Sequence, residues 1–223
     1  MKTYYDHAGI VIYHGDCREI LPTLPKCDLL LTDPPYGIGR DGKPPSTSSH
    51  GGHKGYEFCG WDDEIPTKAT FCLMYEAATD WVIWGANYFT PFIIPGPGWL
   101  LWDKGQRIDQ ADGELAATSR NAPLRIFERN RVQIQLDGAV HPTQKPLALM
   151  KWCLSLFPDA KTVLDPFAGS GTTGVACKVM GLKCTLIEKH EPYCETIAKR
   201  LSQEVFDFDA KLCDECRKDG VKA

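Results

Sequence analysis

The sequence predicts an α/β fold with a mostly parallel sheet, because strands and helices alternate at both ends of the chain. Near the N-terminus, a β-rich run at 10–13 is followed by a helical stretch at 17–24 and by the apolar run at 29–32. A strand, a helix and a strand within so few residues imply parallel pairing through a right-handed crossover. Near the C-terminus the same order recurs, with strands at 162–165 and 183–188 on either side of a helix.

Hydrophobic periodicity predicts the remaining elements. Between the two units we expect a helix at 67–80, strands at 81–85, 98–102 and 131–136, and a helix from Pro146, a residue type that the first turn of a helix tolerates. The C-terminal unit contains a helix at 172–180, and a further helix is expected at 191–205.

Composition limits the class of protein. The chain has 223 residues, 43% of them hydrophobic, which is enough for one substantial core. We therefore expect a single domain at 1–206, with polar insertions near 37–63 and 105–130 and a charged tail at 207–223. The formal charge of −4 argues against a protein coated in nucleic acid but allows a local basic patch.

The sequence contains no run long enough to span a membrane and no signal peptide, so we expect a cytoplasmic protein without a membrane partner. Its ten cysteines are scattered through expected strands and helices, which favours buried reduced thiols over a disulfide framework. Cys213 and Cys216 have the spacing of half a zinc site, but no second pair with that spacing accompanies them. We therefore expect no metal.

The apolar run at 29–32 stops abruptly at the tetrad Asp33-Pro34-Pro35-Tyr36. Two successive prolines cannot continue a β-ladder, since neither has an N–H to donate, and they stiffen the backbone that carries the acid and the ring. Asp33 and Tyr36 should therefore lie just beyond the end of a buried strand, at the edge where open α/β sheets bind ligands. An ordinary strand exit would also fit the tetrad taken alone.

A second motif, Asp165-Pro166-Phe167-Ala168-Gly169-Ser170-Gly171-Thr172-Thr173, lies between an expected strand and an expected helix. Its glycines permit close approach of a ligand, and the helix N-terminus offers free N–H groups. Asp165 would repel a pyrophosphate but suits a cationic or amino-bearing ligand. Glu188, at the end of the next strand, is placed to accept hydrogen bonds from two ribose hydroxyls. Together the two acids fit S-adenosylmethionine better than NAD.

With both motifs in place, the chain resembles the S-adenosylmethionine-dependent DNA amino-methyltransferases, whose signatures are a D/N/S-P-P-Y/F tetrad and a D-P-F-x-G-S-G-T-T loop. The tetrad precedes the loop, an order similar to that of the permuted β class. The segments at 141–146 (His-Pro-Thr-Gln-Lys-Pro) and 14–16 (His-Gly-Asp) resemble two further parts of that class. The resemblance implies a Rossmann-like methyltransferase fold, circularly permuted, whose seven-stranded, mostly parallel sheet has one antiparallel strand.

The resemblance also implies roles for individual residues. The catalytic set would be the tetrad itself, Asp33, Pro34, Pro35 and Tyr36. S-adenosylmethionine would be bound by residues from several segments, namely Asp16, Cys17, Asp33, Lys145, Asp165, Phe167, Ala168, Gly169, Ser170, Gly171, Thr172, Thr173 and Glu188.

The expected chemistry follows from the weakness of an aromatic amine as a nucleophile, since its lone pair is delocalised into the ring. Asp33 and the Pro34 carbonyl would each accept one amino N–H, and an ordinary pKa of about 3.9 makes Asp33 too weak a base to deprotonate the amine first. Tyr36 would stack on a base flipped out of the duplex. Within the family, Asp at the head of the tetrad favours adenine N6 over cytosine N4, which implies a site-specific DNA adenine-N6 methyltransferase, bacterial or phage-encoded.

Double-stranded DNA is therefore the expected partner, and basic residues must contact its phosphates. The candidates are two lysines in the first insertion and four arginines in and after the second, namely Lys43, Lys54, Arg120, Arg125, Arg129 and Arg131. A solvated loop face is the alternative for these residues. The resemblance leaves open whether the protein forms a homodimer and whether a cognate restriction enzyme accompanies it.

Other activities remain open on sequence alone. A cytosine-N4 DNA methyltransferase, or an amino-methyltransferase acting on RNA or protein, would use the same amine chemistry. A nicotinamide-dependent dehydrogenase would leave the tetrad and the 141–146 segment unexplained. A non-catalytic DNA-binding relative would be expected to have a broken tetrad or cofactor loop, and both are intact here.

Overall fold

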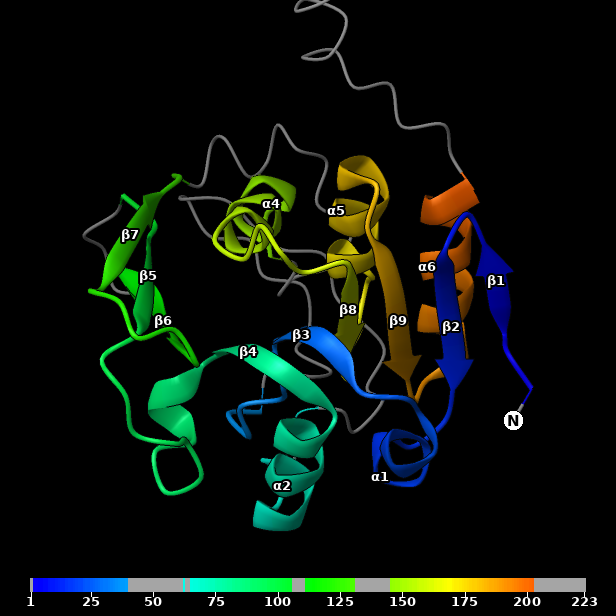
Figure 1. Cartoon of the computed structure of the whole chain (residues 1–223), viewed down its shortest axis with the longest axis horizontal. Coiled ribbons are helices and arrows are strands. Elements are labelled where there is room, and N and C mark those ends of the chain that lie inside the picture. The colour runs from blue at the N-terminus through cyan, green and yellow to red at the C-terminus, as the bar shows by residue number, and fades with distance from the viewer. Residues whose placement is uncertain (1, 40–61, 63–64, 106–110, 131–144, 203–223) are drawn as a thin grey trace, which may run out of the picture.

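The computed structural model describes residues 2–39, 62, 65–105, 111–130 and 145–202, and the structural statements below refer to these residues. Its strands are β1 (Tyr5–His7), β2 (Ile10–His14), β3 (Cys27–Thr32), β4 (Ala78–Trp84), β5 (Trp99–Asp103), β6 (Gly113–Thr118), β7 (Arg125–Glu128), β8 (Thr162–Asp165) and β9 (Lys183–Glu188). They form one sheet with the order β1-β2-β9-β8-β3-β4-β6-β5-β7 (Figure 1).

Helices cover both faces of this sheet. They are α1 (Cys17–Ile20), α2 (Lys68–Glu76), α4 (Leu147–Ser155), α5 (Thr172–Met180) and α6 (Glu191–Ser202), with short 3-10 helices η1 (Leu21–Thr23) and η2 (Ala86–Tyr88). Figure 1 shows α4, α5 and α6 on one face and α1 and α2 on the other. The structure is therefore a three-layer α/β/α sandwich.

The predicted α/β class with a mostly parallel sheet is confirmed, but the expected count of seven strands with one antiparallel member is wrong for the described chain. Nine strands are present, and both β1 and β6 run antiparallel to their neighbours. The sequence did not indicate β6 because its Ala116-Ala117 centre has low β propensity. It lies with β7 inside the region expected to be an insertion at 105–130. The strand expected at 131–136 lies outside the described residues.

The elements at the C-terminal end match the sequence prediction closely. The helix expected at 172–180 and the strand expected at 183–188 have the same bounds as α5 and β9. The helix expected at 67–80 ends at Glu76 instead, because β4 begins at Ala78 and takes the residues that follow.

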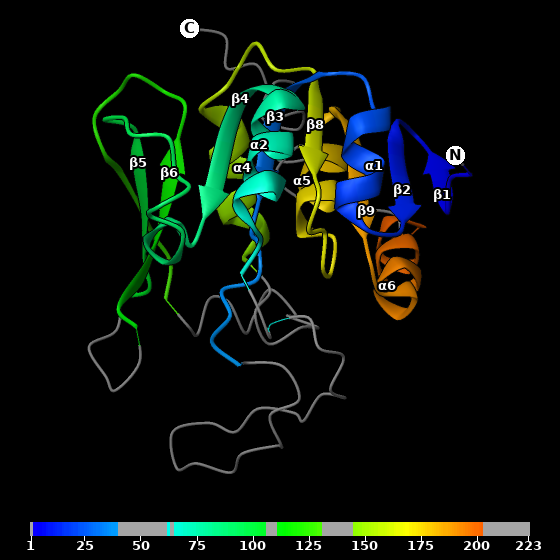
Figure 2. The same cartoon turned by 90° about the horizontal axis from the view of Figure 1, so that it is seen from below.

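The chain reverses its direction of travel across the sheet between β8 and β3. These two strands are parallel neighbours, but β8 continues through α5 to β9 on one side, whereas β3 continues through α2 to β4 on the other. Figure 2 shows β4 and β8 pointing toward the same edge. Such a switch point leaves a crevice at the carboxyl ends of the two strands, which is where ligands bind in open α/β sheets.

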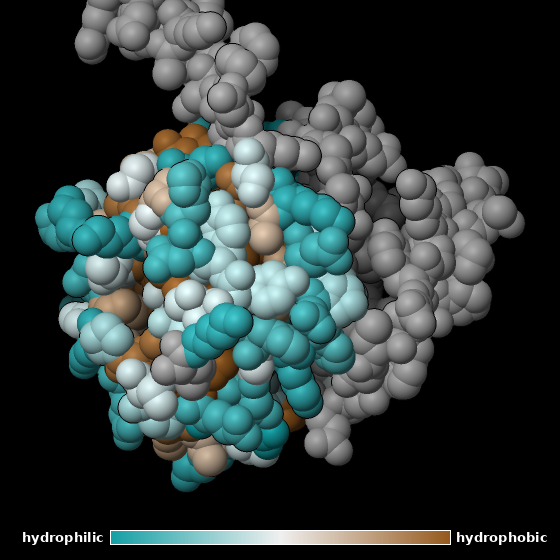
Figure 3. Space-filling view, turned by 90° about the vertical axis from the view of Figure 1, so that its right-hand side faces the viewer, coloured by the Kyte–Doolittle hydropathy of each residue, from teal (hydrophilic) through white to brown (hydrophobic). Residues whose placement is uncertain are grey.

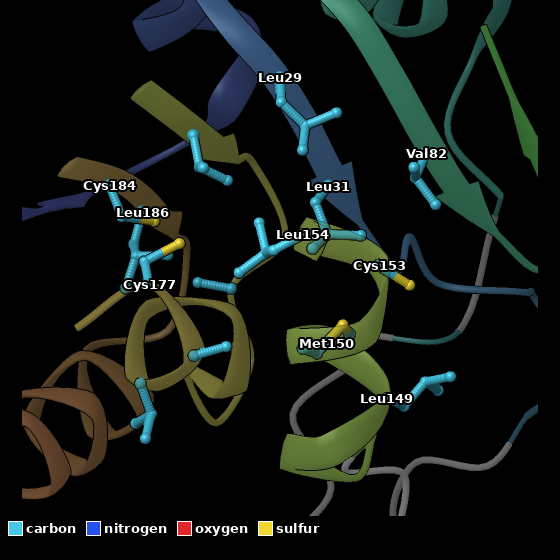
Figure 4. Close-up of a cluster of buried hydrophobic side chains, with 14 of the residues drawn as sticks. Leu29, Leu31, Val82, Leu149, Met150, Cys153, Leu154, Cys177, Cys184 and Leu186 are labelled. Atoms are coloured by element: carbon cyan, nitrogen blue, oxygen red, sulfur yellow. The ribbon is translucent and has the colours of Figure 1, made fainter. Parts of the chain in front are cut away.

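Two hydrophobic clusters hold the layers together. The larger one packs β3, β4 and β9 against α4 and α5, and Figure 4 shows Leu31 of β3 beside Leu154 of α4 in this interface. The smaller one packs the other face of the sheet against α1 and α2. The seven described cysteines are free thiols, most of them buried, as expected.

The outer surface at the β1 and α6 end of the sheet is mainly hydrophilic, with hydrophobic residues scattered singly over it (Figure 3). Within the described chain, none of the helices combines the length and the apolar character needed to cross a bilayer.

Candidate active site

The two sequence motifs meet at the switch point between β3 and β8. Thr32, the last residue of β3, donates a hydrogen bond of 2.7 Å from its hydroxyl to Asp165 Oδ1 at the end of β8, and both side chains are buried. Asp33 is the next residue after Thr32, so the tetrad and the glycine-rich loop begin side by side. Residues more than a hundred positions apart in the chain thus form one site.

Asp165 shapes the loop that follows it. Besides the Thr32 hydroxyl, its Oδ1 accepts the Phe167 N–H at 3.1 Å, and its Oδ2 accepts the Thr173 hydroxyl at 2.7 Å. Burial raises the pKa of this carboxyl to about 6, and these hydrogen bonds oppose the increase. The sequence indicated a contact between Asp165 and a ligand, which stays a prediction; its role in positioning the loop was missed.

The glycines of the loop serve different purposes. Gly169 has φ +53°, and a side chain added there would meet no atom within 4 Å, so this backbone faces open space. A Cβ on Gly171 or Gly174 would instead lie 2.6 Å from Ile197 or Leu186, so these two glycines permit close packing of α5 against α6 and β9. Gly169 is therefore the position where a ligand can approach the backbone.

Glu188, the last residue of the neighbouring strand β9, binds the backbone of the glycine-rich loop. Its Oε2 accepts the Gly169 N–H and its Oε1 accepts the His190 N–H, each at 2.8 Å. A carboxylate offers about four acceptor positions, so both oxygens retain capacity for ligand hydroxyls. The side chain is 7% exposed, and burial raises its pKa to about 7.

The raised pKa of Glu188 has a testable effect on stability. The folded protein retains this proton up to about pH 7, whereas the unfolded chain releases it near the ordinary value of 4.5, so the free energy of unfolding falls as the pH rises between these values. Glu188→Gln removes this contribution. We expect the variant to gain roughly 1–3 kcal/mol relative to the wild type between pH 5 and pH 8, measured by denaturant unfolding. If the difference in the free energy of unfolding between the variant and the wild type does not change with pH, the pKa of Glu188 is not raised in the folded protein.

Asp16 and Cys17 lie after β2 at the same edge of the sheet. Asp16 is the N-cap of α1, where it accepts the Arg18 N–H at 2.9 Å and pairs with the Arg18 guanidinium. This pairing lowers the pKa of Asp16. Cys17 is buried in the smaller hydrophobic cluster, and burial raises its pKa to about 12. The Cys17 thiol therefore faces the core, and a cofactor contact by this residue stays a prediction.

The other loop residues that the sequence singled out are accounted for by local packing. Ala168, Ser170 and Thr172 are buried, and the Ser170 carbonyl accepts a hydrogen bond from the Arg200 guanidinium of α6. Phe167 packs against the smaller hydrophobic cluster. Their backbone groups hold the loop in its turn, and direct contacts with a cofactor stay predictions.

The tetrad side of the site contains an ion cluster formed by Asp33, Tyr36, Lys104, Glu114 and Lys145. Lys145 Nζ donates to Asp33 Oδ2, and the Tyr36 hydroxyl donates to Asp33 Oδ1. Lys145 Nζ also lies 2.9 Å from Glu114 Oε2 and 3.1 Å from the Tyr36 hydroxyl oxygen. Lys104 Nζ lies 2.5 Å from Glu114 Oε1. Two lysines therefore balance two acids.

Sequence reasoning missed Glu114 and Lys104. Glu114 lies near the start of the antiparallel strand β6, and Lys104 directly follows β5, so both reach the carboxyl edge where β3 ends. Two lysines lower the pKa of Glu114 to about 2, against the effect of its burial. Burial raises the pKa of Asp33, and Lys145 opposes this increase. No signal in the sequence links these positions, because the strand that carries Glu114 is itself poorly indicated.

The Tyr36 ring is held on several sides. It stacks on Tyr88 with 4.7 Å between ring centroids and an angle of 15°, and it contacts the edge of Phe89 at 5.9 Å. Asp62 accepts the Tyr36 and Gly37 N–H groups at 2.9 and 2.8 Å. Tyr88 and Asp62 were not indicated by the sequence.

The three described arginines among the expected DNA contacts lie at opposite edges of the sheet. Arg120, which follows the end of β6, and Arg125, at the start of β7, lie at the amino edge, and the Arg120 guanidinium covers the Phe157 ring at 5.8 Å. Arg129 follows the end of β7, and its N–H donates to the Asp103 carbonyl at the carboxyl edge. Arg120 and Arg125 therefore lie away from the carboxyl edge and Arg129 lies at it, and contacts of these three residues with DNA stay predictions.

Several expected residues lie outside the described chain, namely Lys43, Lys54, Arg131, the residues at 141–144 and the cysteines at 213 and 216. Across the described ranges, no group of three or more His, Cys, Asp or Glu side chains could hold a metal ion.

Comparisons with known proteins agree with the family resemblance. Residues 99–200 match the family model of N6 and N4 methyltransferases described as DNA methylase. The Type II methyltransferase M.HinfI of Haemophilus influenzae is 26% identical over an alignment of 250 positions that covers 86% of this chain and 68% of that protein. The Type II methyltransferase M.ScaI of Streptomyces caespitosus is 24% identical and covers 91% of this chain and 84% of its own.

Solved structures share the fold. The M1.HpyAVI–SAM complex has a TM-score of 0.59 at 22% identity and covers 87% of this chain and all of its own. The PvuII DNA methyltransferase, which is cytosine-N4-specific, has a TM-score of 0.60 at 16% identity and covers 97% of this chain and 96% of its own. The arrangement of layers and strands is therefore that of a methyltransferase fold.

Proposed function

We propose that this chain is a DNA methyltransferase of the N6/N4 type, in line with its similarity to that family, and that its methyl acceptor is adenine N6 in double-stranded DNA. One observation carries the proposal. Asp33 follows Thr32, and Thr32 is hydrogen-bonded to Asp165 at the start of the glycine-rich loop, so an expected amine acceptor and an expected nucleoside-binding loop lie side by side at the carboxyl edge of the sheet. Asp at the head of the tetrad supports adenine N6 over cytosine N4.

The residues around the loop fit S-adenosylmethionine. Gly169 leaves open space beside the backbone, and the buried Glu188 carboxylate is an acceptor suited to ribose hydroxyls. Glu188, Gly169 and the backbone of the loop would hold the nucleoside. When bound, S-adenosylmethionine supplies an activated methyl group on a cationic sulfur.

The chain's own groups would prepare the amine. Asp33 and the Pro34 carbonyl each accept one amino hydrogen, which directs the nitrogen lone pair out of conjugation with the ring. The Asp33 carboxylate then stabilises the positive charge that develops on the nitrogen during transfer. A fixed Pro34-Pro35 backbone keeps both acceptors in place and so contributes orientation.

The target base would be flipped out of the duplex, at a cost of a few kcal/mol. Stacking on an aromatic ring offsets about 1–3 kcal/mol of this cost. Tyr36 is the ring that we assign to this contact, since its hydroxyl is fixed on Asp33 and its backbone on Asp62. The half-exposed Tyr88 ring covers one face of the Tyr36 ring. When the base binds, Tyr88 would either move aside or form one stack with Tyr36 and the base.

The test is to incubate the purified protein with S-adenosylmethionine and unmethylated genomic DNA, and then to separate the digested nucleosides by mass spectrometry. N6-methyldeoxyadenosine is the expected product. N4-methyldeoxycytidine would instead identify a cytosine-N4 enzyme, and methylation of RNA or protein alone would overturn the assignment to DNA. Sequencing of the same DNA by a method that reports modified bases would give the recognition sequence.

Among the candidate arginines that the structure describes, Arg129 lies at the carboxyl edge, so we assign it a phosphate contact. Arg129→Gln is expected to weaken DNA binding and to reduce the slope of log Kd against log salt concentration by about 1. Arg125→Gln is the matched control, because Arg125 lies at the opposite end of the same strand β7. Equal slopes for the two variants would exclude this role for Arg129.

A further inference from the structure

Both oxygens of the Asp33 carboxylate already have donors. The Tyr36 hydroxyl occupies Oδ1 and the Lys145 ammonium occupies Oδ2. An amino group that approaches Asp33 must therefore share or displace one of them. The Lys145 side chain is 5% exposed, so its ammonium cannot simply turn into water and needs another acceptor within the protein.

Glu114 is the acceptor within reach. Its Oε2 lies 2.9 Å from Lys145 Nζ, while its Oε1 is held by Lys104 at 2.5 Å. The carboxylate is fixed from the far side by Lys104, and β6 carries it to the same edge as the tetrad. A small movement of Nζ would let the Lys145 ammonium leave Asp33 and pair with Glu114 alone, and its charge would stay out of water.

We propose that Glu114 is a positioning residue that takes over the Lys145 ammonium when the substrate amine occupies Asp33 Oδ2. This role rests on the proposed function, since it requires an amine at Asp33. Glu114 touches neither the base nor the cofactor in this scheme, and it acts through Lys145. Its low pKa, caused by two lysines, keeps it ionised and ready to accept the ammonium.

The inference makes a prediction for Glu114→Gln. Without this carboxylate, Asp33 is the remaining ionised partner of Lys145, so the ammonium stays on Oδ2 and blocks the amine. We expect kcat to fall by roughly 10- to 100-fold, while the affinity for S-adenosylhomocysteine changes little. The measurement is single-turnover methylation of DNA together with calorimetric binding of S-adenosylhomocysteine.

The pH profile separates this role from a merely structural one. The titratable groups that face Lys145 are Asp33, Tyr36 and Glu114, with Lys104 behind Glu114, and the buried Cys153 thiol of α4 also interacts electrostatically with Lys145. Two carboxylates raise the pKa of Lys145, so the loss of one lowers it. Once Lys145 is neutral it no longer pairs with Asp33, and Glu114→Gln should recover part of its activity at alkaline pH, relative to the wild type.

Two further variants serve as controls. Glu114→Asp keeps a carboxylate and should retain more activity than Glu114→Gln, and Lys104→Met keeps Glu114 and should have a smaller effect. If the wild type is active and Glu114→Gln is equally active, the positioning role of Glu114 is wrong, and the proposed function is unaffected. The positioning role is also wrong if Glu114→Gln loses activity in step with a fall in Tm and recovers none of that activity at alkaline pH. A wild type without methyltransferase activity would overturn the proposed function together with this role.

Discussion

Asp33→Ala is expected to lower kcat for methyl transfer by about 10²–10³-fold, the effect typical of removing one preorganised group that stabilises charge in a transition state. The alanine neither accepts the amino hydrogen nor faces the positive charge that develops on the nitrogen. The Pro34 carbonyl remains, which leaves one of the two acceptors. Single-turnover methylation of a DNA fragment that contains the recognition sequence measures the loss.

The same variant should keep most of its affinity for S-adenosylhomocysteine, because the loop and Glu188 lie on the β8 and β9 side of the switch point. Lys145 still has Glu114 at 2.9 Å, so its buried ammonium keeps a partner and the fold should persist. Asp33→Asn retains one oxygen and is expected to fall between the wild type and the alanine variant. Substantial activity in Asp33→Ala would show that another group binds the amine.

Asp165→Ala is expected to destabilise the protein by about 3 kcal/mol, which corresponds to a fall in Tm of roughly 10 °C. The substitution leaves the buried hydroxyls of Thr32 and Thr173 and the Phe167 N–H without their acceptor. The loop would lose its turn, so the affinity for S-adenosylhomocysteine should fall as well. Thermal unfolding and calorimetric binding measure the two effects.

Thr173→Val is the matched control for this prediction, since it removes one of the three hydrogen bonds and leaves the carboxylate in place. We expect it to cost about 1 kcal/mol. An Asp165→Ala variant that matches the wild type in both Tm and cofactor affinity would mean that the carboxylate does not organise the loop.

Local signals explain what could be predicted from the sequence. The unit that runs from β8 through the glycine-rich loop to β9 is indicated by an apolar strand, two special glycines and a helix with one buried face, all within a short stretch. The tetrad is equally local, since two prolines end a leucine-rich strand. These features place Asp33, Asp165 and Glu188 at one edge without knowledge of any long-range contact.

The missed parts of the site depend on tertiary contacts. Glu114 reaches the tetrad through Lys145, which pairs with both Asp33 and Glu114, and these three residues come from separate segments of the chain. β6, which carries Glu114, contains alanines that do not favour a strand. The arginines depend on strand direction in the same way. Arg120 and Arg129 are close in the chain, but Arg120 follows β6 at the amino edge of the sheet and Arg129 follows β7 at the carboxyl edge. Sequence spacing alone could not indicate which of them lies near the tetrad, and their contacts with phosphate stay predictions.

The ion cluster has a consequence for how the protein meets its substrate. With two lysines and two carboxylates in contact, the cluster carries no net charge, so it exerts little long-range force on a polyanion such as DNA. The ion cluster itself thus neither attracts nor repels a nucleic-acid duplex from a distance. If Arg129 contacts phosphate and Asp33 holds the amine, as proposed, DNA affinity and amine chemistry depend on different residues, and each can change in evolution without altering the other.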